Sequence, residues 1–266
     1  YYKRRSDHPL IYEQELLRGC KVKYLPGQID EQDRRCEHGE KHMDLLRKQW
    51  NQQQQALRKA LANGAVRAIE IFLNQHGMVH SAATSSSAER TFEEEVWQGL
   101  SEAQAGCIPA GGEHSIAWVM WHLARIEDVT MNVLLAGSGQ VLHSGDWLKR
   151  LGVDSEETGN GMDVSQVAEL SRQVELRVLR DYRTAVGRRT RVIVRDLQAA
   201  DFKRGVAASR LAKLATEGAI NEASRGLLDY WGGLTVAGLL LMPPTRHNFV
   251  HLNEAMRIKA KCRHVG

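Results

Sequence analysis

The sequence has few of the features that mark secreted or membrane-spanning proteins. Its four cysteines (Cys20, Cys36, Cys107 and Cys262) never form a C-x-x-C pair, and positions so scattered in a chain of 266 residues do not suggest a disulfide framework. We therefore expect free thiols and a reducing cytoplasm as the location. No apolar run reaches the roughly 18–20 residues that a transmembrane helix requires, so we expect no membrane partner. The first residues, YYKRRSDHPL, contain neither a starting Met nor an apolar signal-peptide core, and we interpret them as a truncated or processed terminus.

Proline and phenylalanine are also scarce, with five and four residues, and few segments alternate apolar and polar positions as exposed strands do. Residues of high helix propensity (Ala, Leu, Gln, Glu and Arg) are plentiful. The 36 basic and 32 acidic residues leave a net charge of only +4, which is too small to indicate a nucleic-acid partner by itself. Composition therefore predicts an all-α globular protein.

The pattern of apolar residues predicts several long helices with short connections, which is typical of a helix bundle. One helix is bounded clearly: Ser115 should be its N-cap and Gly137 should end it. The other helices are expected at about 30–61, 65–80, 88–100, 164–197 and 201–217, followed by a closing helix that contains LLLMPPTRHNFVHLNEAMRI at 239–258.

Two histidines, His247 and His251, stand four positions apart in this closing helix. Residues i and i+4 lie one turn apart on the same helix face, which is otherwise apolar here. Such a pair supplies two neutral imidazoles for a divalent cation. His122 is the natural third ligand, because it lies within the apolar segment WVMWHLARIED, where a buried imidazole needs a hydrogen bond or a metal. The alternative is that all three are packing residues.

A second pair, His76 and His80, has the same spacing in NQHGMVHSA. Gly77 weakens the helix between them, and the polar segment SAATSSS follows at once, so the pair stands at a helix end. We interpret the two residues as lining the mouth of a pocket or as capping the helix terminus, where a cationic imidazole is favoured. Metal ligation by this pair is the competing hypothesis.

Two segments, SIAWVMWHLARIEDVTMNVLL and LLMPPTRHNFVHLNEA, together resemble the DinB/YfiT-like family. The resemblance implies a four-helix bundle that binds a divalent metal through three histidines, which are His122, His247 and His251 in this chain. Some members of the wider family act as metal-dependent thiol-S-transferases or isomerases that use a low-molecular-weight thiol.

With this resemblance the chain divides into three predicted regions. Residues 1–30 form an N-terminal extension that is partly disordered. Residues 31–84 form an additional helical region packed on the bundle, and residues 85–262 form the DinB-like four-helix bundle. The first two regions are more than the basic bundle requires.

Two classes of function stay open at this point. The first is an enzyme that uses a divalent metal ion (zinc, nickel, iron or manganese) to activate water or a thiol, by thiol-S-transfer or hydrolase-like chemistry. The second is a non-catalytic, stress-related bundle that acts as a binding or scaffold protein. The expected partner is a small-molecule substrate, with a low-molecular-weight thiol as one candidate, and a homodimer is a candidate assembly.

The charged residues near His122 predict no general base. Glu127 and Asp128 lie at about 140° and 240° around the helix from His122, so they cannot share its face. We expect them to pair with arginines or to orient ligands from a neighbouring helix, and we expect a structural ion pair for Arg125. The basic segments YRTAVGRRTRVIVRD and FKRGVAASRLAK lack interleaved aromatic residues for base stacking. We interpret them as solvated helix faces and do not expect nucleic acid as a partner.

Overall fold

The computed structural model describes residues 31–86 and 90–265, with side chains from residue 41 onward. The predicted extension at 1–30 lies outside the described residues. The chain divides into two compact units, Tyr1–Leu46 and Arg47–Gly266. Of the first unit the structure describes residues 31–46, which form the first half of α1 (Glu31–Ala62). The bundle, the core and the candidate sites all belong to the second unit.

The described residues are helices joined by turns. The longer helices of the second unit are α2 (Ala68–Met78), α6 (Ile116–Glu127), α8 (Val164–Gln173), α9 (Leu176–Arg195), α10 (Ala208–Thr216) and α13 (Asn248–Lys261). The shorter ones are α3 (Ala82–Ser85), α4 (Phe92–Trp97), α5 (Glu102–Gly106), α7 (Trp147–Leu151), α11 (Gly226–Gly232) and α12 (Val236–Leu241). Two π-helical segments, η3 (Asp128–Ala136) and η7 (Met242–His247), continue α6 and join α12 to α13.

The all-α prediction is confirmed. Within residues 31–86 and 90–265 no strand occurs, and the one isolated β-bridge pairs Gly205 with Thr235. In the same described ranges, no helix is both long enough and apolar enough to cross a membrane.

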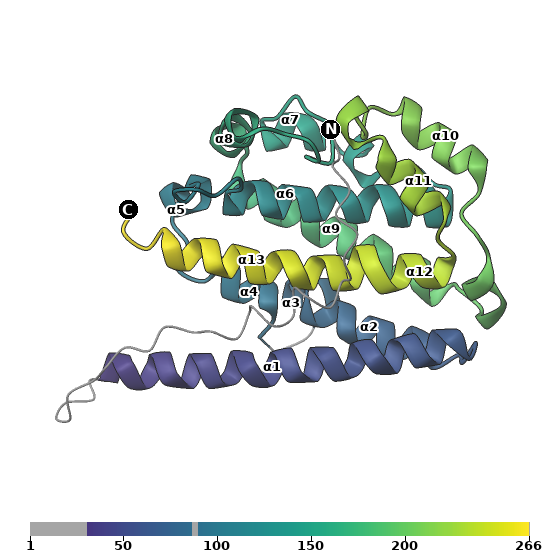
Figure 1. The fold of residues 1–266 in the computed structure, drawn as a ribbon, viewed down its shortest axis with the longest axis horizontal. Helices are drawn as coiled ribbons and strands as arrows, with labels where there is room; N and C mark the ends of the chain where they lie inside the picture. Colours follow the sequence, from purple (N-terminus) through teal and green to yellow (C-terminus); the bar gives the residue numbers. More distant parts are fainter. Residues whose placement is uncertain (1–30, 87–89, 266) are drawn as a thin grey trace. The chain divides into compact units, whose positions relative to one another are not determined.

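The bundle is built around α6, which packs against both α9 and α13 (Figure 1). The helices α12 and α13 follow one another along the bundle, and the shorter α2 and α4 pack against α9 and α13 respectively. Every residue of α6 is buried, as expected for a helix that is apolar on nearly every face. Side chains of α6 therefore meet those of α13 inside the bundle.

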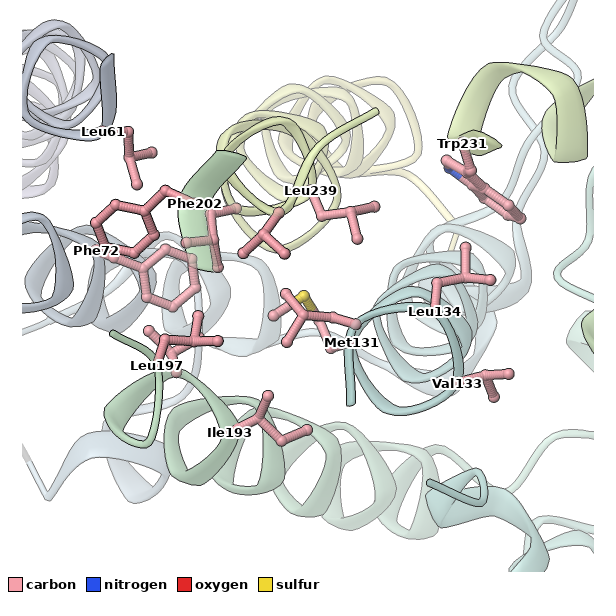
Figure 2. Close-up of a cluster of buried hydrophobic side chains, with 14 of the residues drawn as sticks. Leu61, Phe72, Met131, Val133, Leu134, Ile193, Leu197, Phe202, Trp231 and Leu239 are labelled. Carbon is pink, nitrogen blue, oxygen red and sulfur yellow. The ribbon is translucent and has the colours of Figure 1, made fainter. Parts of the chain in front are cut away.

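A cluster of buried apolar side chains joins α2, η3, α9 and α12 (Figure 2). Phe72 and Met131 are fully buried in it, and Ile193 and Leu239 approach them from α9 and α12. Burying one such side chain contributes about 1.5–3 kcal/mol. The cluster fixes the end of the bundle from which α12 leads into the histidine-bearing segment.

The central helix has the predicted boundaries. The Oγ of Ser115 accepts a hydrogen bond from the amide of Trp118 at 3.0 Å. At the other end Gly137 has a φ of 70°, the left-handed conformation that glycine adopts without strain. The sequence did not predict that the second half of this helix, η3, widens to π-helical geometry.

The predicted helix at 164–197 is in fact two helices, α8 and α9. Val174 and Glu175 between them have extended backbone, with ψ of 125° and 102°. Neither residue is a glycine or a proline, so the apolar spacing continues across the break and hides it.

The helix predicted at 201–217 is also shorter than expected, since α10 begins only at Ala208. Residues 201–203 belong to a 3-10 helix, η5 (Ala199–Lys203), and the chain from Arg204 to Ala207 is extended because it pairs with the segment before α12. The amide of Val206 donates to the carbonyl of Leu234 at 3.2 Å. A partner so distant in sequence leaves no local pattern.

Cys107 and Cys262 form a disulfide, so the free-thiol prediction is wrong for this pair. The two residues follow the ends of α5 and α13, and their Cα atoms lie 6.4 Å apart, within the range that a disulfide spans. A separation of 155 positions in sequence gave no indication of the pairing. The side chains of Cys20 and Cys36 lie outside the described residues.

Candidate metal centre

His122 occupies the middle of α6 and is only 2% exposed. Its Nδ1 donates a hydrogen bond to the carbonyl of Thr158 at 2.7 Å, and its ring stacks on Trp118 with centroids 4.7 Å apart. Because Nδ1 carries the proton in this bond, the Nε2 atom keeps a free lone pair.

The closing helix is interrupted just before His247. Pro244 has no N–H to donate to the carbonyl of Leu240, and the chain widens here into the π-helical turn η7. The hydroxyl of Thr245 donates to this carbonyl at 2.9 Å. Regular α-helix resumes directly after His247, so His247 and His251 keep the predicted i, i+4 relation.

The structure brings the three predicted ligands together. One candidate ligand atom from each of His122, His247 and His251 lies within 4.8 Å of the other two. The Nε2 atoms of His122 and His247 are 3.0 Å apart. The Nδ1 of His251 donates to Glu254 Oε2 at 2.6 Å, which leaves Nε2 of this ring for a ligand. Three imidazoles, two of them with Nδ1 fixed, therefore converge from α6, η7 and α13.

This donor set fits a divalent cation. Metal-ligating histidines usually donate their second N–H to a backbone carbonyl or a carboxylate, as His122 and His251 do. Burial, together with the neighbouring His251, lowers the pKa of His122 to about 3. Burial and the neighbouring His122 also hold the pKa of His247 well below its usual range. Both rings therefore stay neutral, which is the form that binds a metal.

A cavity of about 340 Å³ lies against the three histidines. Its walls are mainly apolar and aromatic, with contributions from Trp118, Leu227, Tyr230, Trp231 and Met242. Among its lining residues there is no Lys, Arg, Asp or Glu. The size and lining are those of a site for a small, largely apolar molecule.

A further histidine of this cavity, His114, precedes α6 and was not predicted from the sequence. Its ring stacks on Trp118 with centroids 3.7 Å apart, and its Nδ1 donates to Glu254 Oε1 at 2.8 Å. Glu254 thus accepts hydrogen bonds from both His114 and His251. Although its burial acts in the opposite direction, these bonds hold the pKa of the Glu254 carboxyl well below its usual range. No local pattern joins His114 to a carboxylate 140 positions later.

Arg125, which follows His122 in α6, forms a structural ion pair, as predicted. This side chain is fully buried and donates to Asp128 Oδ2 at 3.2 Å and to the hydroxyl of Tyr182 at 2.9 Å. The hydroxyl of Tyr182 in turn donates to Asp128 at 2.6 Å. Arg125 does not line the cavity.

His76 and His80 belong to a second group. Both are fully buried and neither lines the cavity, so the interpretation as pocket-mouth residues is wrong. Their rings stack with centroids 4.1 Å apart, and their Nε2 atoms lie 2.9 and 2.8 Å from the carboxylate oxygens of Glu127. Glu127 does not share the face of His122, as predicted, and its carboxylate contacts His76 and His80 instead.

Two arginines of the basic segment in α9 are internal. Arg183 is fully buried and its Nε lies 2.8 Å from Glu93 Oε2. Arg191 donates to the carbonyl of Leu73 in α2 at 2.6 Å. The expectation of a wholly solvated face is therefore wrong at these two positions, where the guanidinium groups join α9 to its neighbours.

The central part of the chain matches a known protein family. Residues 88–249 match a family model described as the DinB superfamily, and this range is more than half of the chain. The match confirms the resemblance seen in the sequence. It includes His122 and His247, and His251 follows two positions after its end. No curated protein matches the chain.

Proposed function

This chain belongs to the DinB superfamily, and we propose that it is a metal-dependent enzyme acting on a small molecule at His122, His247 and His251. The observation that supports the proposal is the position of three converging imidazoles against a cavity of about 340 Å³. Structural metal sites are usually closed by protein ligands, whereas catalytic sites keep a position open for water or substrate.

In this proposal the three histidines hold the cation through nitrogens that the protein has already oriented. The carbonyl of Thr158 and the carboxylate of Glu254 fix the rings of His122 and His251 from behind. Little reorganisation is then needed when the site is loaded. When bound, a divalent ion on neutral imidazoles lowers the pKa of a coordinated water or thiol and so supplies a nucleophile.

His114 is the lining residue that we propose as general base. Glu254 accepts its Nδ1–H, so Nε2 of His114 is the atom that can take a proton from a substrate or a thiol in the cavity. The carboxylate then stabilises the imidazolium, as in other histidine–carboxylate pairs. Stacking on Trp118 keeps the plane of the His114 ring fixed.

The lining of the cavity favours an uncharged substrate. Its walls carry no Lys or Arg that could neutralise a carboxylate or a phosphate, and they offer Trp118, Tyr230 and Trp231 as apolar surface. We therefore propose a small apolar electrophile as the substrate class. A low-molecular-weight thiol or water would be the nucleophile.

The proposal is tested with untagged protein loaded with Co²⁺, whose visible absorption reports the ligands of the ion. Removing one of three imidazoles in His251→Ala should abolish tight binding at this site. Adding 2-mercaptoethanol to the loaded wild type should produce a sulfur-to-metal charge-transfer band that the variant lacks. The matched control is His143→Ala, since His143 is a partly exposed histidine that pairs with Glu156 outside the site.

Two results would contradict an open catalytic site. In the first, wild-type protein shows no Co²⁺ spectrum that is lost in His251→Ala. In the second, neither 2-mercaptoethanol nor azide, added as a ligand for the ion, changes the wild-type spectrum. Either result would favour the alternative, a non-catalytic binding or scaffold protein.

A further inference from the structure

A second set of metal-ligand atoms is buried where α2 meets the end of α6. His76 Nε2 lies 2.9 Å from Glu127 Oε1, and His80 Nε2 lies 2.8 Å from Glu127 Oε2. All three side chains are fully buried. One candidate ligand atom from each of the three side chains lies within 4.8 Å of the other two. Two atoms that each lie about 2.0–2.1 Å from one tetrahedral ion are about 3.3–3.4 Å apart. The observed spacings are those of hydrogen bonds, and the side chains need to separate by only about 0.5 Å to hold an ion.

Within the side chains that the structure describes, no arginine or lysine forms an ion pair with the carboxylate of Glu127. The neighbouring buried carboxylate, Glu93, pairs with Arg183 at 2.8 Å. Among the described residues, the ion-pair partners of Glu127 are the two imidazoles. A buried carboxylate with little compensating charge is costly, and a cation would remove that cost.

His80 lies between two carboxylates. Its Nε2 is 2.8 Å from Glu127, and its Nδ1 is 3.9 Å from Glu93 Oε2. A neutral imidazole has one N–H and cannot donate in both directions. A cation at Nε2 resolves this, because Nδ1 then carries the proton and faces Glu93. A carboxylate behind a ligating histidine is the usual arrangement at metal sites.

The surrounding residues leave room for the His80 ring and fix Glu127. Gly187 lies within α9, where a Cβ atom would come 2.7 Å from the Nδ1 of His80. Asn248, the first residue of α13, donates to Glu127 Oε2 at 2.8 Å. The amide of Asn248 therefore orients the carboxylate and is not itself a ligand.

We propose that His76, His80 and Glu127 form a second, closed site for a divalent cation, with two imidazole nitrogens and two carboxylate oxygens as ligand atoms. Nitrogen and carboxylate ligands suit zinc and neighbouring first-row metals. None of the three residues lines the cavity of the first site, so no position is open for a substrate. The cation would hold α2 against α6 and contribute to folding.

The test counts zinc per chain after the three-histidine site has been removed. His122→Ala/His251→Ala, purified without a tag and dialysed against EDTA, should retain about one equivalent, because the buried site exchanges slowly. Adding Glu127→Gln, which keeps the shape of the side chain, should remove this equivalent. The matched control is Asp128→Asn, which changes an equally buried carboxylate that pairs with Arg125 instead. Circular dichroism checks that each protein is folded.

Gly187→Ala provides a test that alters no ligand. The added methyl group must displace the ring of His80, so the same equivalent should be lost while α9 stays helical. The proposal would be overturned if the His122→Ala/His251→Ala protein is folded but carries no zinc, and if added zinc does not raise its unfolding midpoint. The three residues would then form only a hydrogen-bonded His–Glu–His network. Equal zinc in this variant and in wild type, both loaded with zinc and measured before the EDTA step, would instead count against the three-histidine site, so the two proposals fail in different ways.

Discussion

The Nε2 atoms of His122 and His247 lie 3.0 Å apart, although 125 positions separate the two residues in the sequence. Thr158 accepts the Nδ1–H of His122, so the Nε2 of His122 offers a lone pair to its neighbour. In the metal-free protein His247 must direct its own N–H at that lone pair, and its buried Nδ1 is then an acceptor without a partner among the described residues. A cation between the rings would use both lone pairs. The groups that hold the ligands from behind are the carbonyl of Thr158 for His122 and the carboxylate of Glu254 for His251.

Glu254→Gln tests one of these groups. The carboxylate of Glu254 accepts hydrogen bonds from His251 and His114, and a neutral amide of the same shape holds the two rings less firmly. We expect metal affinity at the three-histidine site to fall by about 10- to 100-fold, as is typical when a carboxylate behind a ligating histidine is changed. Competition with a chromophoric chelator measures the affinity.

The matched control for this substitution is Glu156→Gln, because Glu156 accepts from His143, a histidine outside the cavity. An unchanged affinity in Glu254→Gln would show that the carboxylate has no part in holding His251.

The three-histidine set could be predicted from sequence because most of its signal is local. The i, i+4 spacing of His247 and His251 and the apolar surroundings of His122 are visible without any tertiary information. Their meeting in space followed from the expectation that both helix faces are internal. The π-helical turn before His247 could not be predicted, since two prolines in sequence do not reveal how the freed carbonyls are satisfied.

The second cluster was misread for a physical reason. The angle of Glu127 around α6 correctly excluded it from the face of His122, but an angle does not say which helix covers the opposite face. The polar segment after His80 suggested exposure, whereas it forms α3, which packs against α9. Gly187 was the available signal, because a glycine within a long helix costs about 1 kcal/mol relative to alanine and needs a packing reason.

Tyr182 should make stability depend on alkaline pH. Burial first, and then Asp128, raise the pKa of its phenol well above the ordinary value of 10.0. Below about pH 10 the phenol is protonated in both folded and unfolded chains, so its hydrogen bonds stabilise the protein fully. As pH rises above that value the unfolded chain loses the proton first, and this stabilisation is lost.

Tyr182→Phe removes both the hydrogen bonds and the titration. Wild type should exceed this variant by about 1.5–3 kcal/mol in free energy of unfolding at pH 8, as for hydrogen bonds to charged groups. The difference should shrink by up to about 1.4 kcal/mol per pH unit above pH 10. Urea unfolding at pH 8, 9, 10 and 11 measures it, and a difference that stays constant through pH 11 would contradict the assignment.

The disulfide between Cys107 and Cys262 should stabilise the second unit strongly. It closes a loop of 155 positions between α5 and α13, and a cross-link over so long a loop removes about 5 kcal/mol of unfolded-state entropy in the chain-entropy model. Cys107→Ser/Cys262→Ser should therefore unfold at a lower urea concentration than oxidised wild type. Reductant should lower the wild-type midpoint toward that of the variant and leave the variant unchanged. Thiols are counted in denatured protein with and without prior reduction. Reduction should add two thiols per chain in wild type and none in the variant. An equal number of wild-type thiols before and after reduction would show that the disulfide is not formed in solution.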